Sequence, residues 1–192
     1  MRHRIFIAIN LPQKIKNELV QYQKEVEKFF EENIHPIRWT KKENLHITVE
    51  FLGYLHDREI EKVKEILREI SKKISPFEVE LFKICYAPEK EKIPRMIWAV
   101  GEKSDVLCKM KRDLDQKLEK EIGFRPEKRE FNPHITVGRI RKWQFKAIPL
   151  DERPEIERDI ELKFKVNSIE LMESFLKRTG PEYKIIESFL FS

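Results

Sequence analysis

Two stretches of sequence decide the fold: LHITVEFL at residues 45–52 and PHITVG at residues 133–138. Both alternate between apolar and polar residues, which is the period of a β-strand with one buried face. The alternation turns the histidine and the threonine of each stretch to one side, and the isoleucine and valine to the other. We therefore expect two strands, one in each half of the chain, that each present an imidazole and a hydroxyl on the face opposite the core.

These four side chains, His46, Thr48, His134 and Thr136, suit the cleavage of a phosphodiester. Five His and four Thr in 192 residues make a single His-x-Thr triplet uncommon, and the chain has two. If the strands lie side by side or across a groove, a neutral imidazole can take a proton from an attacking oxygen while a protonated one supplies the leaving oxygen. The hydroxyls can donate hydrogen bonds to the non-bridging phosphate oxygens, where negative charge builds up.

Two alternatives to a catalytic site also fit the His-x-Thr triplets. Each triplet could be an ordinary half-exposed strand pattern, or the four residues could hold a metal. Two His and two Thr are a poor ligand set for zinc, which takes three or four His, Cys or carboxylate ligands. Glu50 could add a carboxylate on the first strand, but the second strand has none in register. Cys85 and Cys108 are too few for a Cys-based zinc site or a disulfide framework. We expect no metal and no cofactor.

Composition restricts the class of protein. The 192 residues suit one large domain or two small lobes. A hydrophobic content of 40% suffices for a packed core and excludes a disordered chain, a collagen-like fibre and a disulfide scaffold. The 39 Lys and Arg against 34 Asp and Glu leave a net charge of +5, which is a weak indication of a polyanionic partner. Many Lys and Glu with few Asn and Gln are typical of a thermophile's surface.

The N-terminal segment MRHRIFIAIN contains an apolar run that Asn10 and Pro12 interrupt. It predicts neither a signal peptide nor a membrane span, so we expect a soluble cytoplasmic protein with no membrane partner. Residues 4–9 are short and β-branched, which predicts a buried strand.

Periodicity predicts most of the remaining elements. Apolar residues at helical spacing predict three helices, and Asp57 is the expected N-cap of the second. Alternation predicts four further strands, and the first motif strand is expected to end at Gly53. In the third helix, Lys111 lies among interleaved acidic and basic residues, which predicts a solvated, ion-paired face. The expected helices are 12–32, 57–73 and 103–121, the further strands are 77–82, 96–100, about 160–175 and about 183–190, and residues 142–157 are expected to be a loop or a single helical turn.

The element order βαβαββαβββ favours an α+β fold over a doubly wound sheet. No change in composition marks a linker, so we expect residues 1–192 to form a single domain. Each half has a helix-bearing unit and one His-x-Thr strand, which suggests a pseudo-symmetric pair of lobes.

The sequence resembles the two-histidine phosphoesterase superfamily, and within it the bacterial and archaeal RNA 2′,3′-cyclic phosphodiesterases, also called 2′-5′ RNA ligases. The resemblance covers essentially the whole chain and implies two lobes of antiparallel sheet with outer helices, whose motifs face each other across a central groove. It also implies opening of a terminal RNA 2′,3′-cyclic phosphate to a 2′-phosphate without a metal, and joining of RNA ends through a 2′-5′ linkage. The matching residues are RIFIAINLP at 4–12, Trp39, NLHITVEFLG at 44–53, FNPHITVGR at 131–139 and GPEY at 180–183.

The resemblance assigns roles to particular residues. His46 and His134 would be the acid and base, with His46 protonating the departing 3′-oxygen and His134 activating water, or with the two roles exchanged. Thr48, Thr136 and Arg139 would bind the phosphate. Arg139 has the wrong parity to share a face with His134 in a regular strand, and a bulge at the preceding glycine would turn it inward.

Phe6 and Trp39 are candidates for stacking on a terminal base, although both could instead belong to the core. The expected partner is RNA with a 2′,3′-cyclic phosphate end, with tRNA halves as one source, and the expected oligomeric state is a monomer. Two alternatives stay open. One is a two-histidine phosphodiesterase for small cyclic nucleotides or 2′-5′ oligoadenylate, and the other is a module that binds RNA ends without turnover.

Overall fold

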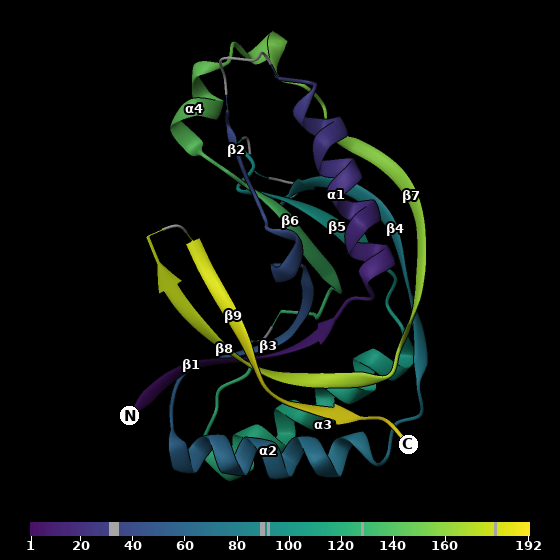
Figure 1. The fold of residues 1–192 in the computed structure, drawn as a ribbon, viewed down its shortest axis with the longest axis vertical. Coiled ribbons are helices and arrows are strands. Elements are labelled where there is room, and N and C mark those ends of the chain that lie inside the picture. The colour runs from purple at the N-terminus through teal and green to yellow at the C-terminus, as the bar shows by residue number, and fades with distance from the viewer. Residues whose placement is uncertain (31–34, 89–90, 92, 128, 179) are drawn as a thin grey trace.

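The computed structural model describes residues 1–30, 35–88, 91, 93–127, 129–178 and 180–192, which form a large antiparallel sheet with four α-helices (Figure 1). The strands are β1 (Arg2–Asn10), β2 (Ile37–Trp39), β3 (His46–His56), β4 (Phe77–Ala87), β5 (Met96–Gly101), β6 (His134–Ile140), β7 (Glu157–Val166), β8 (Ser168–Lys177) and β9 (Gly180–Leu190). The α-helices are α1 (Gln13–Glu27), α2 (Asp57–Ser71), α3 (Asp105–Ile122) and α4 (Lys142–Ala147), and the 3-10 helices are η1 (Lys42–Asn44) and η2 (Leu150–Glu152).

The sheet has two halves that meet at the motif strands. Its strand order is β7-β4-β5-β6-β3-β1-β8-β9, with β2 paired to β6. The β3 half contains β3, β1, β8 and β9, and the β6 half contains β6, β5, β4, β7 and β2. A single register pair, Ile47 with Ile135, joins the halves. The expected α+β fold of antiparallel sheet is therefore confirmed. The pairing of β3 with β6 connects the two halves into one continuous sheet.

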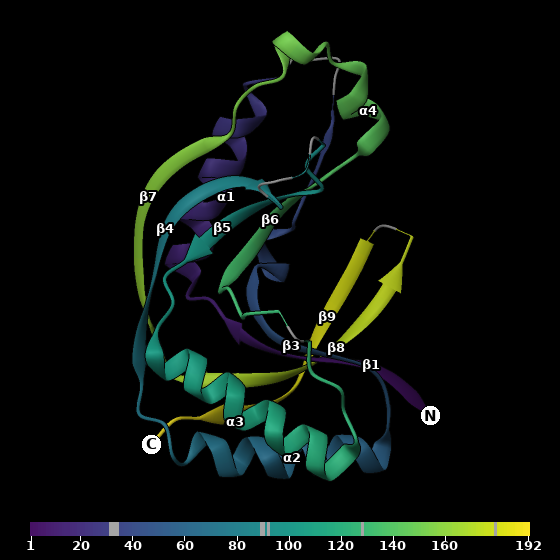
Figure 2. The ribbon, with the colours of Figure 1, turned by 180° about the vertical axis from the view of Figure 1, so that it is seen from behind.

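The helices cover the outside of the sheet, and two of them, α1 and α3, lie against the half to which their preceding strands do not belong. Figures 1 and 2 show α1, which follows β1 of the β3 half, lying beside the β6 half. They also show α3, which follows β5 of the β6 half, lying next to α2 beneath the β3 half. The two halves are therefore held together by exchanged helices as well as by the sheet.

The helix predictions are correct in most details. The apolar face of α2 is buried as predicted, and α3 ends at Gly123, whose φ of 64° suits a glycine at a helix C-terminus. The N-cap of α2 is His56 and not Asp57, and the backbone N–H of His56 donates to Glu59 Oε2 at 2.7 Å. The helix begins there because β3 continues to His56 without an intervening loop.

The strand predictions are wrong in three places. The first motif strand passes through Gly53, whose φ of 76° lies at a shift in the pairing of β1 with β3. The expected strand at 160–175 is two strands, β7 and β8, which are separated at Asn167; β7 is one edge of the sheet, and β8 lies in the other half, between β1 and β9. Apolar residues occupy the even positions from Ile160 to Val166 and the odd positions Ile169 and Leu171, so the alternation changes phase at Asn167 and the sequence does contain a signal of the break. The three residues of β2 are too few for periodicity to detect.

Two further expectations can be compared with the structure. Helix α1 ends at Glu27, so the expected helix is too long at residues 28–30, which form a turn, and its residues 31–32 lie outside the described residues. Residues 142–157 contain α4 and η2, in agreement with a helical turn in this segment. Within the described chain, no helix combines the length and the apolar character needed to cross a membrane.

Candidate active site

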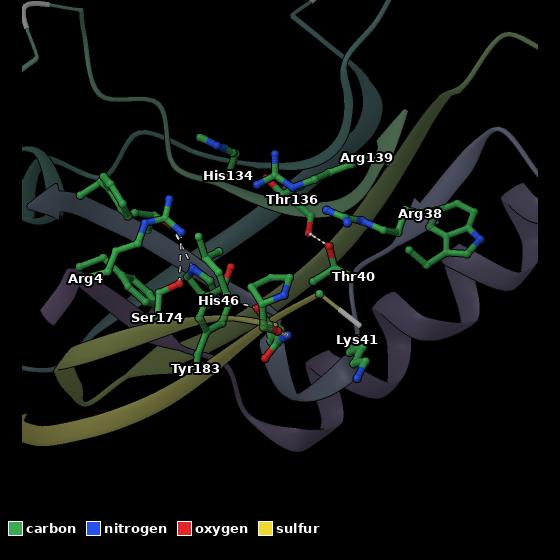
Figure 3. Close-up of a pocket in the computed structure, with 18 residues that line it drawn as sticks. Arg4, Arg38, Thr40, Lys41, His46, His134, Thr136, Arg139, Ser174 and Tyr183 are labelled. Atoms are coloured by element: carbon green, nitrogen blue, oxygen red, sulfur yellow. Dashed lines mark hydrogen bonds between the residues drawn. The ribbon is translucent and has the colours of Figure 1, made fainter. Parts of the chain in front are cut away.

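Both His-x-Thr triplets lie at the centre of the sheet, where β3 meets β6. The central residues of the triplets, Ile47 and Ile135, are fully buried on one side of the junction. The histidines and threonines project to the other side, where they line a pocket of about 510 Å³ (Figure 3). The sequence-predicted residues that line this pocket are His46, Thr48, His134, Thr136, Arg139, Phe6 and Trp39.

The two histidines are oriented by the same hydrogen bond. The Nδ1 of His46 lies 2.7 Å from the backbone oxygen of Asn44, and the Nδ1 of His134 lies 2.8 Å from the backbone oxygen of Asn132. A carbonyl oxygen only accepts, so Nδ1 carries hydrogen in both rings. The Nε2 atoms are then the ones that can take up or give up a proton. The motif residue two positions before each histidine therefore fixes the tautomer.

His46 is enclosed by aromatic rings. Its ring centroid lies 5.1 Å from that of Phe6 and 5.2 Å from that of Tyr183. The side chain of Asn44 donates to the backbone oxygen of Pro181 at 2.8 Å, which ties the start of β3 to β9. Burial, opposed by the bond to Asn44 and aided by the nearby Lys16, lowers the pKa of His46 to about 4. His46 is therefore neutral at pH 7 when the pocket holds no anion.

His134 has a different environment. Its ring stacks on the indole of Trp98, with centroids 3.8 Å apart and an angle of 26° between the planes. Burial lowers the pKa of His134 below the usual value of a histidine, and the hydrogen bond to Asn132 acts in the opposite direction. The stacking supports the ring on one face, and His134 is less deeply buried than His46.

The threonines are held in different ways. The Oγ1 of Thr48 lies 3.0 Å from His46 Nε2, so the hydroxyl can donate to the neutral ring. The backbone oxygen of Thr136 accepts a hydrogen bond of 2.7 Å from Thr40 Oγ1, which fastens β2 to β6. The chain beside β2 thus supports the second motif.

A bulge brings Arg139 into the pocket. In the pairing of β5 with β6, Trp98 faces Thr136 and Ile97 faces Gly138, so Val137 is the extra residue. The extra residue reverses the alternation beyond it, which is why Arg139 lines the pocket together with His134. The predicted bulge is therefore present, one residue before the glycine. A Cβ at Gly138 would lie 2.8 Å from Ile37 Cγ2, so the close approach of β2 requires glycine here.

The first half repeats this bulge with a different outcome. In the pairing of β1 with β3, Ala8 faces Thr48 and Ile7 faces Glu50, so the pairing skips Val49. The bulge turns Phe51 into the pocket at the position that corresponds to Arg139, five residues after the histidine. The guanidinium of Arg4 lies over the Phe51 ring at 4.7 Å from its centroid, and it donates to Ser174 Oγ at 3.4 Å. Each half of the sheet therefore supplies one arginine next to these bulges, Arg4 from the β3 half and Arg139 from the β6 half.

The charge of the pocket lining is entirely positive. Its charged side chains are Arg4, Arg38, Lys41 and Arg139, and the described lining contains no Asp or Glu. An anionic ligand is the partner that such a lining favours.

Glu50, the carboxylate considered as a metal ligand, lies elsewhere. It is buried against α3, where its Oε2 is 2.5 Å from Lys111 Nζ. Lys111 is 8% exposed and also binds Asp115, so the expected solvated face of this helix is wrong at this residue. Among the described residues, no three His, Cys, Asp or Glu side chains gather into a group that could hold a metal.

The sequence analysis did not identify several pocket residues. Arg4 shares the strand parity of Phe6 and could have been found from it, and Tyr183 is within one of the stretches that carry the resemblance. Arg38 lies within β2 and Lys41 follows it, and this strand is too short to predict, so no pattern pointed to them. Trp98, which does not line the pocket itself, was placed on a strand, but only the structure shows that its indole stacks on the His134 ring.

The chain resembles known proteins in sequence over almost its whole length. Residues 9–98 and 101–183 match the model of the LigT-like phosphoesterase family. A protein of Methanocaldococcus jannaschii called RNA 2′,3′-cyclic phosphodiesterase is 35% identical over 97% of this chain and 99% of its own length. A protein of Thermotoga maritima with the same name is 32% identical over 95% of this chain and 92% of its own length.

Solved structures have the same fold. The crystal structure of TT0787 of Thermus thermophilus superposes with a TM-score of 0.83 at 25% identity, covering 98% of this chain and 97% of the other. Escherichia coli LigT complexed with 3′-AMP superposes with a TM-score of 0.77 at 19% identity, covering 100% of this chain and 99% of the other. Together with the two motifs, this agreement in sequence and fold means that the chain belongs to the LigT-like phosphoesterase family.

Proposed function

We propose that this chain is an RNA 2′,3′-cyclic phosphodiesterase, in which His46 and His134 transfer the protons that open a terminal cyclic phosphate to a 2′-phosphate. The relatives that match nearly its full length carry the name of this activity. The observation that carries the assignment of the site is that both histidines hold Nδ1–H on a backbone carbonyl and share one cationic pocket. This leaves two Nε2 atoms to act on the same bound phosphate.

The proposed reaction proceeds in one displacement at phosphorus. The Nε2 of His134 takes a proton from a water molecule as the water oxygen bonds to phosphorus. The bond between phosphorus and the 3′-oxygen breaks, and the Nε2–H of His46 protonates that oxygen. Thr48, Thr136 and Arg139 bind the non-bridging oxygens, which gain negative charge in the transition state. The products are a 2′-phosphate and a free 3′-hydroxyl, so every atom of the water is accounted for.

The surroundings of the two histidines support this division of roles. His134 is less deeply buried than His46, which favours access of water to its ring. His46 is packed between Phe6 and Tyr183, and its low pKa makes its protonated form a strong acid toward a departing alkoxide. A bound phosphate supplies the negative charge that favours the protonated form of His46. If the 5′-hydroxyl of a second RNA takes the place of water, the same transfers make a 2′-5′ linkage.

The proposal is tested with an oligoribonucleotide that carries a terminal 2′,3′-cyclic phosphate, incubated in the presence of EDTA. The expected product has a 2′-phosphate, and His46→Ala and His134→Ala should each lower kcat by at least about a hundredfold. His35→Ala, a substitution of an exposed histidine outside the pocket, is the matched control and should retain the wild-type rate. Full activity in both motif variants, or no opening of the cyclic phosphate by the wild type, would show the proposal to be wrong.

A second experiment compares this substrate with those of other two-histidine enzymes. Under the same conditions, 2′-5′ oligoadenylate and 3′,5′-cyclic nucleotides should give lower kcat/KM values than the RNA 2′,3′-cyclic phosphate. A higher kcat/KM on either of them would reassign the substrate while leaving the two-histidine chemistry in place.

A further inference from the structure

Two arginines face each other across the edge of the pocket. Arg38 of β2 and Arg139 of β6 are partners in the antiparallel register, and both line the pocket. Neither arginine forms an ion pair with any residue that the structure describes. Like charges directly opposite each other destabilise a strand pair. Repulsion between these two arginines therefore destabilises the free protein, and a bound anion would relieve it.

The backbone holds this pair firmly. The backbone N–H of Thr40 donates to the backbone oxygen of Val137 at 3.0 Å. The side-chain amide of Gln23 in α1 donates to the backbone oxygens of both Thr40 and Val137, at 2.9 and 2.8 Å. The missing Cβ of Gly138 lets β2 pack closely. Arg38 is therefore presented from a rigid strand, which reduces the entropy lost when it binds a ligand.

The pocket has two chemically different ends. At one end lie Phe6, Phe51 and Tyr183, where the cation among the described lining residues, Arg4, is already stacked on Phe51 and bonded to Ser174. At the other end lie Arg38, Thr40 and Lys41, and Figure 3 shows them on the far side of His46 from Arg4. Arg38 and Lys41 make no side-chain hydrogen bond with the described residues. The aromatic end suits a nucleoside and the other end suits a second anion.

We propose that Arg38, assisted by Lys41, binds the phosphate on the 5′ side of the terminal nucleotide. This inference rests on the proposed function, since it places the reacting phosphate between the histidines and Arg139. Arg38 is the register partner of Arg139 on the neighbouring strand. When Arg139 binds the reacting phosphate, the next phosphate of the same RNA strand therefore falls within reach of Arg38. The substrate is then an RNA end or a 5′-phosphorylated nucleotide, in preference to a nucleoside 2′,3′-cyclic phosphate.

The test compares three substrates that differ by defined groups. They are adenosine 2′,3′-cyclic phosphate, the same molecule with a 5′-phosphate, and the dinucleotide ApA ending in a 2′,3′-cyclic phosphate. For the wild type, the added phosphate should lower KM about tenfold, the effect of one charge-assisted contact. In Arg38→Ala, and in Arg38→Gln as a second variant, this advantage should be lost. The slope of log KM against log salt for the dinucleotide should also fall by about 0.7, as expected for one phosphate contact on a single strand.

Two further variants separate the alternatives. Arg112→Ala removes one positive charge from the exposed face of α3, away from the pocket, and should retain the tenfold advantage. Arg4→Ala tests the aromatic end of the pocket. The inference is overturned if Arg4→Ala and not Arg38→Ala removes the advantage, or if Arg38→Ala raises KM equally for all three substrates. It is also overturned if the wild type gains nothing from the 5′-phosphate, whereas failure to open any 2′,3′-cyclic phosphate overturns the proposed function itself.

Discussion

Ile47 and Ile135 face each other in register, and this pair of fully buried residues joins β3 to β6. In an antiparallel pair, the residue before one partner lies opposite the residue after the other. Position 46 therefore lies toward 136, and position 48 toward 134, so that each histidine is next to the threonine of the other triplet. One apolar contact thus sets the spacing between the two groups that transfer protons.

Shortening Ile47 should weaken both stability and catalysis. Ile47→Val should cost about 0.5–1.5 kcal/mol of unfolding free energy, and Ile47→Ala about 2–5 kcal/mol, because a fully buried side chain leaves a cavity. The kcat of the Val variant should fall, since small displacements of catalytic groups reduce rates strongly. Urea denaturation and steady-state kinetics measure the two effects. Ile66→Val removes the same methylene from α2 and should leave kcat unchanged. If both Val variants have the wild-type kcat, the pair does not set the spacing.

The low pKa of His46 makes part of the folding stability depend on pH. The folded value is about 4 against 6.5 for an unperturbed histidine, so the unfolded chain binds the proton more tightly. The contribution is fully present above pH 6.5 and is lost as the pH falls toward 4. Between pH 7 and pH 4 the wild type should lose up to about 3 kcal/mol more than His46→Gln, measured by chemical denaturation at each pH. Parallel stability curves for the two proteins would contradict this expectation.

The sequence predicted the centre of the molecule better than its edges. The faces of the triplets follow from strand periodicity, and the bulge that turns Arg139 inward was expected from its parity and the adjacent Gly138. Lys111 was misplaced because its helix is charged on several sides, and only its contact with Glu50 of β3 explains its burial. The pocket wall at Arg38 depends on the pairing of β2 with β6, a contact between segments about one hundred residues apart. Local periodicity contains no information about such pairings.

The pH dependence of the rate follows from the two depressed histidine pKa values. The profile of kcat/KM reports the free enzyme, in which the proposed mechanism needs protonated His46 and neutral His134. Since the pKa of His46 is about 4 and burial lowers that of His134 below 6.5, kcat/KM should be highest below pH 6.5 and fall as the pH rises further. In the complex, the phosphate charge raises the pKa of both rings, so the descending limb of kcat should lie at a higher pH. A kcat/KM that increases steadily from pH 5 to pH 8 is incompatible with these roles.

The buried pair behind the first motif gives the last prediction. Lys111 Nζ lies 2.5 Å from Glu50 Oε2 and 2.5 Å from Asp115 Oδ2, and both Glu50 and Lys111 are 8% exposed. Lys111→Met should destabilise the fold by about 3–5 kcal/mol, because it leaves a buried carboxylate without its cation and beside a second carboxylate.

The same pair has a testable pH signature. Burial already raises the pKa of Glu50, and loss of Lys111 removes the charge that opposes this shift. A carboxyl whose folded pKa is raised favours the folded state when protonated, so Lys111→Met should be more destabilised at pH 8 than at pH 5. The double variant Lys111→Met, Glu50→Gln removes the buried charge and should recover much of the loss, as measured by urea denaturation. If Lys111→Met is equally stable at both pH values, the unpaired carboxylate of Glu50 does not cause the destabilisation. The loss of the packing contacts of the lysine side chain is then its cause.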